Sequence, residues 1–423
     1  MNKCVVLFLL AFTSSKAQVS SNILIQRNGL SNFANKINQL HKNDTITIAF
    51  IGGSITQAEH GWRDHTFTWF KKQYPAIAFK QINAAIGGTG SDLGVYRLSE
   101  QVLKYKPDLL FVEFAVNDYD FSRTSILRSM EGIVRKTIIA NSATDICFVY
   151  TITSDMYELY KKDSTPHTVK IMEEIADHYK IPSVNLGLNI TRLVNTKQLF
   201  LTGNKPVLND SIFFSADGVH PYPETGHLEY FKTLSVSLTK LLAPKKKLKH
   251  KLIKPFYSDA LQYSSMIDIT ADMQKKPIEL VRKYPSDLGN AFTDKMPNLL
   301  LLNDTAQEIS FQFKGDRIGF MDVLAPSSAQ ITAYIDNDPP RYINRFDRFC
   351  FYFSRPHWFF IDGLTNSSHR IRIKISTNQP DKFLLLEKGK NKGDLKDIDD
   401  YNKFIWRVGK ILVSQVASKH YKN

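Results

Sequence analysis

The fold is decided by residues 45–56, TITIAFIGGSIT, where an apolar run passes into a Gly-Gly-Ser turn. The apolar part is rich in β-branched residues, which is typical of a strand buried on both faces of a sheet. Gly52 and Gly53 let the backbone turn tightly and leave the hydroxyl of Ser54 exposed at the end of that strand. An N-cap serine that merely begins a helix is the alternative interpretation of Ser54.

Four similar runs follow, and helical patterns lie between them. The runs are AFKQINAAIGG (78–88), DLLFVEFAVND (108–118), DICFVYTIT (145–153) and IPSVNL (181–186). The clearest helical pattern covers 165–180, where apolar side chains recur on one face. This alternation predicts an α/β domain with a parallel sheet of doubly buried strands, whose ligand site lies at the carboxyl ends of the strands.

After about residue 257 the pattern changes to short alternating runs, which predict an antiparallel β-sandwich. The predicted strands are EISFQFKG (308–315), AQITAYIDN (329–337), FCFYF (349–353), HWFFIDG (357–363) and HRIRIKIS (369–376). Residues 244–256, PKKKLKHKLIKPF, are interpreted as a basic linker, or as a charged strap over the first domain. They lack the interleaved aromatic residues of a single-strand nucleic-acid binder.

The first 17 residues have the pattern of an export signal. Lys3 supplies a positive charge, residues 5–12 form an apolar core, and Ser15 and Ala17 offer small side chains for cleavage. A buried N-terminal strand is the alternative. The signal pattern predicts an exported protein, periplasmic or extracellular. Because the apolar core of the signal is too short to span a bilayer, we expect no membrane insertion.

Composition sets wider limits. A chain of 423 residues exceeds the usual size of one hydrophobic core, and 43% hydrophobic with 23% charged residues excludes a disordered or collagen-like chain. A net charge of +14 favours acidic partners without choosing among nucleic acid, anionic polysaccharide and membrane. Cys147 and Cys350 lie in apolar runs of different domains, so we expect two buried free thiols.

Three more polar segments follow the apolar runs. Residues 83–90, NAAIGGTG, let backbone N–H groups approach a ligand, although an ordinary turn or a phosphate cradle fits this segment too. Asn117 can donate its side-chain N–H to an oxyanion, or simply form a turn. Asp217 and His220 in DGVHP can orient an imidazole as a general base, whereas a metal site would need more ligands. Together with the serine, these groups make an acyl-transfer site at one sheet edge.

These segments resemble the four blocks of the SGNH/GDSL hydrolase superfamily, and the resemblance covers about residues 40–242. One departure is that the usual Gly-Asp-Ser of the first block is Gly-Gly-Ser here. The matching residues are Ser54 in GGSIT, Gly88 in AAIGGTG, Asn117 in AVND, and His220 with Asp217 in DGVHP.

The resemblance implies a flavodoxin-like three-layer α/β/α domain and a serine esterase that works through an acyl-enzyme. Its catalytic residues would be Ser54 as nucleophile, His220 as general base and Asp217 as the partner of the imidazole. The oxyanion hole would consist of the backbone N–H groups of Ser54 and Gly88 with the side chain of Asn117. The glycine before Gly88 is the alternative donor.

The second domain resembles the jelly-roll accessory modules of carbohydrate esterases, in Tyr334-Ile335-Asp336 and in the turn 363–369. Trp358, Tyr342 and Phe346 either stack on sugar rings or pack in the sandwich core. We therefore expect a secreted esterase that removes O-acetyl groups from a polysaccharide or oligosaccharide, with no cofactor, metal or nucleic acid. The alternatives are a general short-chain esterase, lipase or thioesterase, and a non-catalytic glycan-binding protein.

The predicted organisation is an export signal (1–17), the SGNH domain (18–243), the basic linker (244–256) and the β-sandwich (257–423). The sequence leaves the polymer and the oligomeric state open. Some polar residues near the blocks have structural interpretations as well as functional ones. Glu59, His60, Arg63 and Asp64 either line the substrate pocket or cap a helix, His227 is expected to pack or lie on the surface, and Glu113 is not assigned a role.

Overall fold

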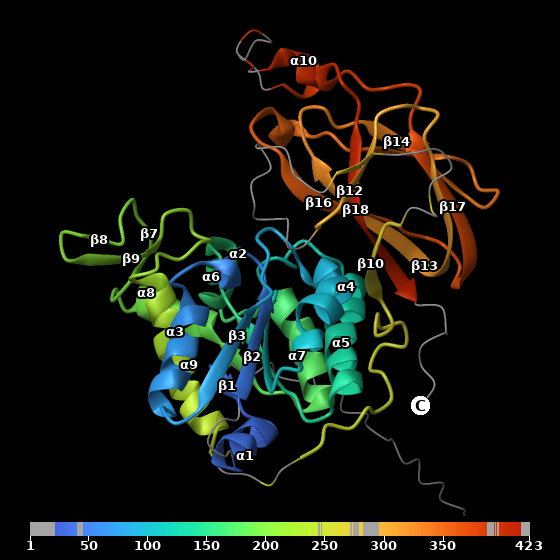
Figure 1. The fold of residues 1–423 in the computed structure, drawn as a ribbon. Coiled ribbons are helices and arrows are strands. Elements are labelled where there is room, and N and C mark those ends of the chain that lie inside the picture. The colour runs from blue at the N-terminus through green and yellow to red at the C-terminus, as the bar shows by residue number, and fades with distance from the viewer. Residues whose placement is uncertain are drawn as a thin grey trace, which may run out of the picture.

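The computed structural model describes residues 22–39, 45–243, 246, 248–270, 273, 279–281, 296–386, 393, 395 and 397–415. The expected export signal lies outside these residues. The chain forms an α/β domain with a β-rich domain beside one end of its sheet (Figure 1). Within the described ranges, no helix is both long and apolar enough to cross a membrane.

The first domain is built on a six-stranded sheet with the order β1-β6-β5-β4-β2-β3. β1 (Leu24–Ile25) pairs antiparallel with its neighbour, and the other pairs are parallel. The predicted parallel sheet and α/β fold class are thereby confirmed. The parallel strands are β2 (Thr45–Gly52), β3 (Ala78–Asn83), β4 (Leu109–Glu113), β5 (Asp145–Tyr150) and β6 (Ser183–Asn185).

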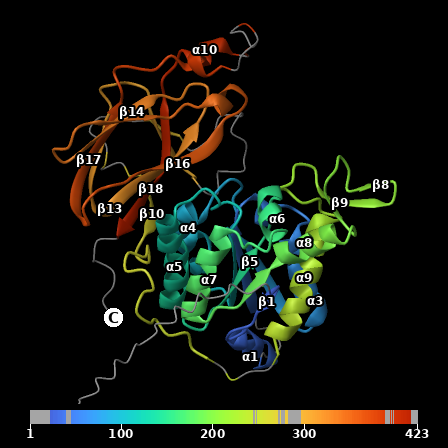
Figure 2. The ribbon, with the colours of Figure 1, turned by 180° about the vertical axis from the view of Figure 1, so that it is seen from behind.

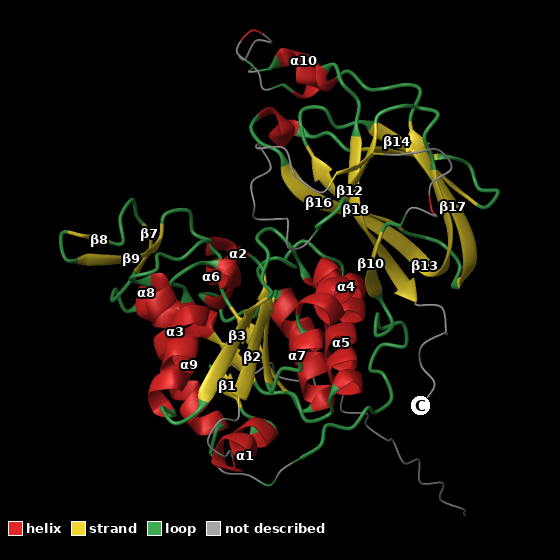
Figure 3. Ribbon diagram, in the orientation of Figure 1, coloured by secondary structure: helices red, strands yellow, loops and turns green. Residues whose placement is uncertain are grey.

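Helices cover both faces of this sheet (Figure 3). One face carries α3 (Trp62–Gln73), α8 (Leu186–Asn195) and α9 (Gly226–Leu241), and the other carries α4 (Ser91–Gln101), α5 (Arg123–Ala140) and α7 (His167–Tyr179). Further helices are α1 (Ser31–Gln39), α2 (Ser54–Gln57), α6 (Ser154–Tyr160) and the 3₁₀ turn η1 (Leu103–Tyr105). The helix α7 confirms the pattern predicted for 165–180.

Two expectations for this domain were wrong. β3 is an edge strand rather than a doubly buried one, and Lys80 in its middle is exposed. A three-stranded sheet was also missed between α8 and α9. Consequently Asp217 and His220 do not follow a strand of the parallel sheet, because they come after the last strand of this smaller sheet. Its strands are β7 (Phe200–Thr202), β8 (Val207–Leu208) and β9 (Ser211–Ser215).

The second domain is a nine-stranded sheet whose strand pairs are all antiparallel, as predicted. Its longest strand, β13 (Ile309–Leu324), pairs with β17 in its first half and with β16 and β18 in its second half. The other strands are β10 (Ser265–Asp268), β11 (Glu279–Val281), β12 (Leu299–Leu302), β14 (Gln330–Ile335), β15 (Arg341–Asn344), β16 (Arg355–Ile361), β17 (Ser367–Ile375) and β18 (Trp406–Gln415).

The run FCFYF (349–353) was predicted as a strand, and that prediction was wrong. The chain forms a 3₁₀ helix, η5 (Arg348–Phe351), because the carboxylate of Asp347 accepts the N–H of Phe349 at 2.9 Å and caps it. Two other short helices in this domain are η6 (Lys382–Leu385) and α10 (Ile398–Tyr401). Cys350 in η5 and Cys147 in β5 are buried free thiols, as expected.

The described part of the basic segment 244–256 lies along the first domain. The N–H of Leu248 donates to Asn32 Oδ1 at 3.1 Å, His250 Nε2 lies 2.8 Å from Asp145 Oδ1, and the N–H of Phe256 donates to Glu131 Oε1 at 2.6 Å. These contacts hold the segment against α1, β5 and α5 of the first domain, as a strap would be.

The two domains also share apolar packing. The main core cluster of the first domain extends into the second one through seven buried residues: Leu261, Met266, Met296, Leu299, Met321, Val323 and Leu412. The buried Lys136 of α5 donates to Val95 O of α4 at 2.6 Å and, across the same interface, to Ser264 O at 2.8 Å. Figure 2 shows β10, β13 and β18 beside α4 and α5.

Candidate active site

Ser54 is the first residue of α2 and comes directly after Gly52 and Gly53 at the end of β2. A Cβ on Gly53 would collide with the side chain of Asn117, and one on Gly52 would lie 2.7 Å from Glu113 O. Glycine is therefore required at both positions, because the turn packs directly against the end of β4. The turn places Ser54 at the carboxyl edge of the sheet.

A chain of hydrogen bonds joins Ser54 to the DGVHP loop. Ser54 Oγ lies 2.9 Å from His220 Nε2, and His220 Nδ1 lies 2.7 Å from Asp217 Oδ2. The second oxygen of Asp217 accepts the backbone N–H groups of Val219 at 2.9 Å and His220 at 2.8 Å. The structure thus brings the three predicted catalytic side chains together.

These hydrogen bonds keep Asp217 ionised. Partial burial acts to raise the pKa of its carboxyl group, but the hydrogen bonds from the His220 ring and from the two backbone N–H groups outweigh burial and lower the pKa to about 2. A permanently charged carboxylate fixes the imidazole with Nδ1 protonated and leaves Nε2 as an acceptor for the serine proton.

The DGVHP loop is anchored outside the parallel sheet. Gly218 adopts φ +76°, a conformation that favours glycine, and its N–H donates to Ser215 Oγ at 2.8 Å. Its carbonyl accepts the N–H of Ser154, the first residue of α6, at 2.9 Å. The loop is therefore held between β9 and α6.

The candidate oxyanion residues lie on the next two strand ends. Asn117 follows β4, and its Oδ1 is buried without a hydrogen-bond partner. Gly88 has φ +71°, and a Cβ there would meet no atom within 4 Å. The N–H of Gly87 is occupied, because it donates to Gln57 Oε1 at 2.7 Å.

Sequence reasoning missed the side chains that hold these loops. Gln57 ties α2 to the glycine loop, and the buried Arg97 of α4 donates to Gly52 O at 3.3 Å and to Ala84 O. Only the spacing of Gln57, three residues after Ser54 on the same short helix, offered a signal. Arg97 lies inside an amphipathic helical pattern, and that pattern gave no signal of its contacts.

Two other polar residues near Ser54, Arg63 and Glu113, make structural contacts. Arg63 is buried and donates to Thr56 O at 3.0 Å and to Ala58 O at 3.2 Å, so it caps α2. Glu113 is fully buried and accepts the hydroxyl groups of Thr56 at 2.8 Å and Thr151 at 2.7 Å. Burial raises the pKa of Glu113 although these hydrogen bonds oppose it.

His227 packs inside the domain, where its Nδ1 accepts the N–H of Trp62 at 3.2 Å. Burial, with the nearby His65, His220 and Arg63, lowers the pKa of His227 to about 3. Its neutral form therefore stabilises the fold above the pKa of the unfolded state, about 6.5, and this contribution is lost as the pH falls toward 3.

We expect His227→Gln to remove this pH dependence. Between pH 7 and pH 5 the free energy of unfolding of the wild type should fall by about 2 kcal/mol relative to the variant, because only the unfolded wild type gains the proton. Urea denaturation of both proteins at the two pH values measures this difference. Parallel pH profiles would contradict the assignment.

The aromatic side chains proposed for sugar stacking separate into three environments. Phe346 is buried in the second domain, Trp358 is partly buried against the first domain with its Nε1 donating to Asp92 Oδ2 at 3.2 Å, and Tyr342 is 64% exposed. Only Tyr342 of these three therefore presents its ring largely to solvent.

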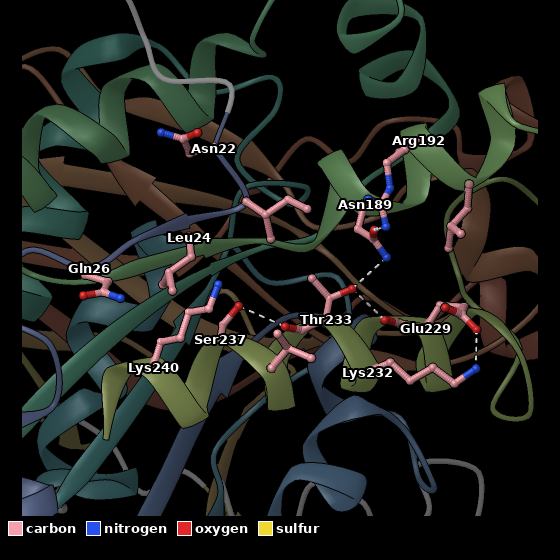
Figure 4. A pocket seen from close by; sticks show the side chains of 13 residues that line it. Asn22, Leu24, Gln26, Asn189, Arg192, Glu229, Lys232, Thr233, Ser237 and Lys240 are labelled. Carbon is pink, nitrogen blue, oxygen red and sulfur yellow. Dashed lines mark hydrogen bonds and ion pairs between the residues drawn. The ribbon is translucent and has the colours of Figure 1, made fainter. Parts of the chain in front are cut away.

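A cavity of about 880 Å³ lies elsewhere on the first domain, between β1, α8 and α9 (Figure 4). Asn189, Arg192, Lys232 and Lys240 are among the residues that line it, whereas Ser54, Asp217 and His220 are not. No group of His, Cys, Asp and Glu side chains suited to a metal ion occurs in the ranges that the structure describes.

A serine hydrogen-bonded to a His–Asp pair at the carboxyl edge of an α/β sheet is the arrangement of a serine hydrolase. Residues 50–225 match the model of the GDSL-like Lipase/Acylhydrolase family. This part of the chain is similar to that family, and the protein is a carboxylic ester hydrolase.

Solved structures extend the comparison to both domains. A two-domain esterase (CEX) active on acetylated mannans, co-crystallised with mannopentaose, has a TM-score of 0.68 and 19% identity, over 94% of this chain and 100% of that one. Another structure described as a two-domain esterase (CEX) active on acetylated mannans has a TM-score of 0.69 and 19% identity, over 93% of this chain and 100% of that one. A catalytic mutant of an acetylxylan esterase from Geobacillus stearothermophilus has a TM-score of 0.35 and 16% identity, over 48% of this chain and 98% of that one. No curated protein sequence matched.

Proposed function

We propose that the protein removes O-acetyl groups from a polysaccharide or oligosaccharide through an acyl-enzyme on Ser54. The observation that carries the proposed chemistry is the hydrogen-bonded chain from Ser54 through His220 to Asp217. The likeness of both domains to a two-domain esterase active on acetylated mannans supports the substrate class. An exported location would suit such a substrate and follows from the expected signal at residues 1–17.

In the first half of the reaction, Ser54 Oγ attacks the acetyl carbonyl while its proton passes to His220 Nε2. The tetrahedral intermediate collapses, and the sugar oxygen leaves with the proton from His220. In the second half, water gives a proton to His220 and attacks the acyl-enzyme. Acetate then leaves, and Ser54 regains its proton. Asp217 stabilises the imidazolium in both halves.

The oxyanion of each intermediate would be held by the backbone N–H groups of Ser54 and Gly88 and by the Nδ2 of Asn117. Gly88 is favoured over Gly87 because the N–H of Gly87 already donates to Gln57. The open space beside Gly88 leaves its backbone accessible to a ligand.

We expect Asn117→Ala to lower kcat by about 10²–10³-fold, equivalent to about 2.7–4 kcal/mol of barrier, because one preorganised donor is lost. The KM for a small aryl acetate should change little, since the donor acts mainly on the oxyanion. Steady-state kinetics measure both constants. A kcat equal to that of the wild type would show that Asn117 does not stabilise the oxyanion.

The substrate class is tested by acetate release from a panel of O-acetylated mannan, xylan and pectin polymers, with Ser54→Ala as the control. Serine-dependent release from one polymer would support the proposal and identify the substrate. Activity on aryl acetates alone would keep the mechanism and favour a general short-chain esterase. Release that persists in Ser54→Ala would contradict the proposed nucleophile.

A further inference from the structure

Helix α4 contacts each of the loops that carry Ser54, Gly88 and Asn117. At its N-terminus the N–H of Ser91 donates to Asp118 Oδ1 at 2.8 Å. Asp118 is fully buried and directly follows Asn117 in the chain. A Cβ on Gly90, just before α4, would lie 2.6 Å from the same oxygen, so the two loops are in close contact.

Arg97 connects α4 to the other two loops. Its guanidinium is fully buried and donates to Gly52 O, two residues before Ser54, at 3.3 Å. It also donates to Ala84 O and, at 3.4 Å, to Thr89 Oγ1. These last two residues flank Gly88, so one side chain joins the nucleophile turn to both sides of the glycine loop.

The second domain contacts three residues of α4 that are spaced four apart, Asp92, Tyr96 and Glu100. Trp358 Nε1 donates to Asp92 Oδ2 at 3.2 Å, the Phe360 ring lies 5.2 Å from the Tyr96 ring, and Lys410 Nζ lies 3.1 Å from Glu100 Oε2. Positions four apart form one stripe along a helix. α4 therefore presents one stripe to the second domain, while Ser91 and Arg97 contact the loops of the site.

We propose that the second domain positions the oxyanion hole through α4, with Trp358 and Arg97 as positioning residues. The inference rests on the proposed function, because it assigns Gly88 and Asn117 to the oxyanion hole. A change in the position of α4 would move the Gly88 loop and Asp118 together relative to Ser54. Small displacements of this kind have large effects on rate, since donors must meet the oxyanion at hydrogen-bond distance.

The test uses Trp358→Phe in the full-length protein with a small aryl acetate as substrate. Phenylalanine keeps an aromatic ring beside His357 but cannot donate to Asp92. We expect kcat to fall by about tenfold with an unchanged KM. The rate at which an aryl phosphonate labels Ser54 should fall by a similar factor, because its phosphoryl oxygen occupies the same hole.

Two further variants sharpen the test. Phe353→Ala changes a half-exposed aromatic residue of the same domain and should leave both rates unchanged on the small ester. Arg97→Lys keeps the charge but loses the fork that reaches Gly52 and Ala84 together, so both rates should fall. Circular dichroism and thermal melting establish that each variant is folded.

Wild-type kcat and labelling rates in folded Trp358→Phe would overturn the proposal. A loss confined to polymer substrates would also overturn it, since that result would assign Trp358 to glycan binding. Labelling of wild-type Ser54 without hydrolysis of any ester would contradict the proposed function alone, and the labelling rates of the variants would still decide the role of the second domain. Failure to label the wild type would overturn both.

Discussion

Replacing Ser54 by alanine should lower kcat by about 10⁶-fold, to the background of the assay, because no oxygen remains to form the acyl-enzyme. The hydroxyl is hydrogen-bonded to His220 at the sheet edge and does not belong to the core, so the variant should fold normally. Acetate release and phosphonate labelling measure the loss. Ser235→Ala, which removes a serine hydroxyl on α9, is a matched control and should retain full activity.

Substantial turnover by Ser54→Ala would place the nucleophile elsewhere. The identity of the nucleophile can be checked independently, because mass spectrometry of the phosphonate-labelled wild type locates the modified serine directly. A label on any other serine would contradict the assignment.

Replacing Asp217 by asparagine should lower kcat by about 10⁴-fold, because the amide no longer holds the imidazole in the required tautomer or stabilises its charged form. The carboxyl group has a pKa of about 2, so Asp217 is ionised throughout the working pH range of the wild type. The acid limb of the wild-type profile should therefore not depend on Asp217. Measurements of kcat from pH 5 to 9 test both statements.

The control for this variant is Asp210→Asn, which changes an exposed carboxylate in the turn before β9. It should retain the wild-type kcat. Similar activities of the two variants would exclude Asp217 from catalysis.

The sheet was predictable because its strands carry their own signal. Residues 45–52 and 109–113 are buried almost throughout and mostly apolar, since helices cover both faces of the strands. β3 misled the prediction because an edge strand can be partly apolar without burial on both faces. β7, β8 and β9 are too short and too exposed to produce a regular alternation of apolar and polar residues, and β1 has only two residues.

The candidate site was predictable only in part, for a physical reason. Ser54, Gly88, Asp217 and His220 lie in or next to turns whose glycine and proline residues mark them in the sequence, and Asn117 is marked by the Asn-Asp pair that ends an apolar run. Arg97 and Gln57 act on backbone carbonyl and N–H groups of loops distant in sequence. Such contacts depend on how α4 and α2 pack. Only the spacing of Gln57 from Ser54 gave a local signal, and no local pattern encodes the contacts of Arg97.

The FCFYF segment illustrates a related difficulty. Its alternation of aromatic residues fits a strand, but a single capping carboxylate, Asp347, turns the chain into a 3₁₀ helix. Cys350 then points into a small core, while the rings of Phe349 and Phe353 remain about half exposed.

The core that passes from the first domain into the second has a consequence for modularity. Met321, Val323 and Leu412 lie on strands of the second domain but are buried in the main cluster of the first. Removing either domain would expose this apolar surface to water, and Lys136 would lose its partner at Ser264 O. The two domains are therefore not interchangeable units joined by a tether. A substitution at this boundary should therefore disturb the packing of both domains.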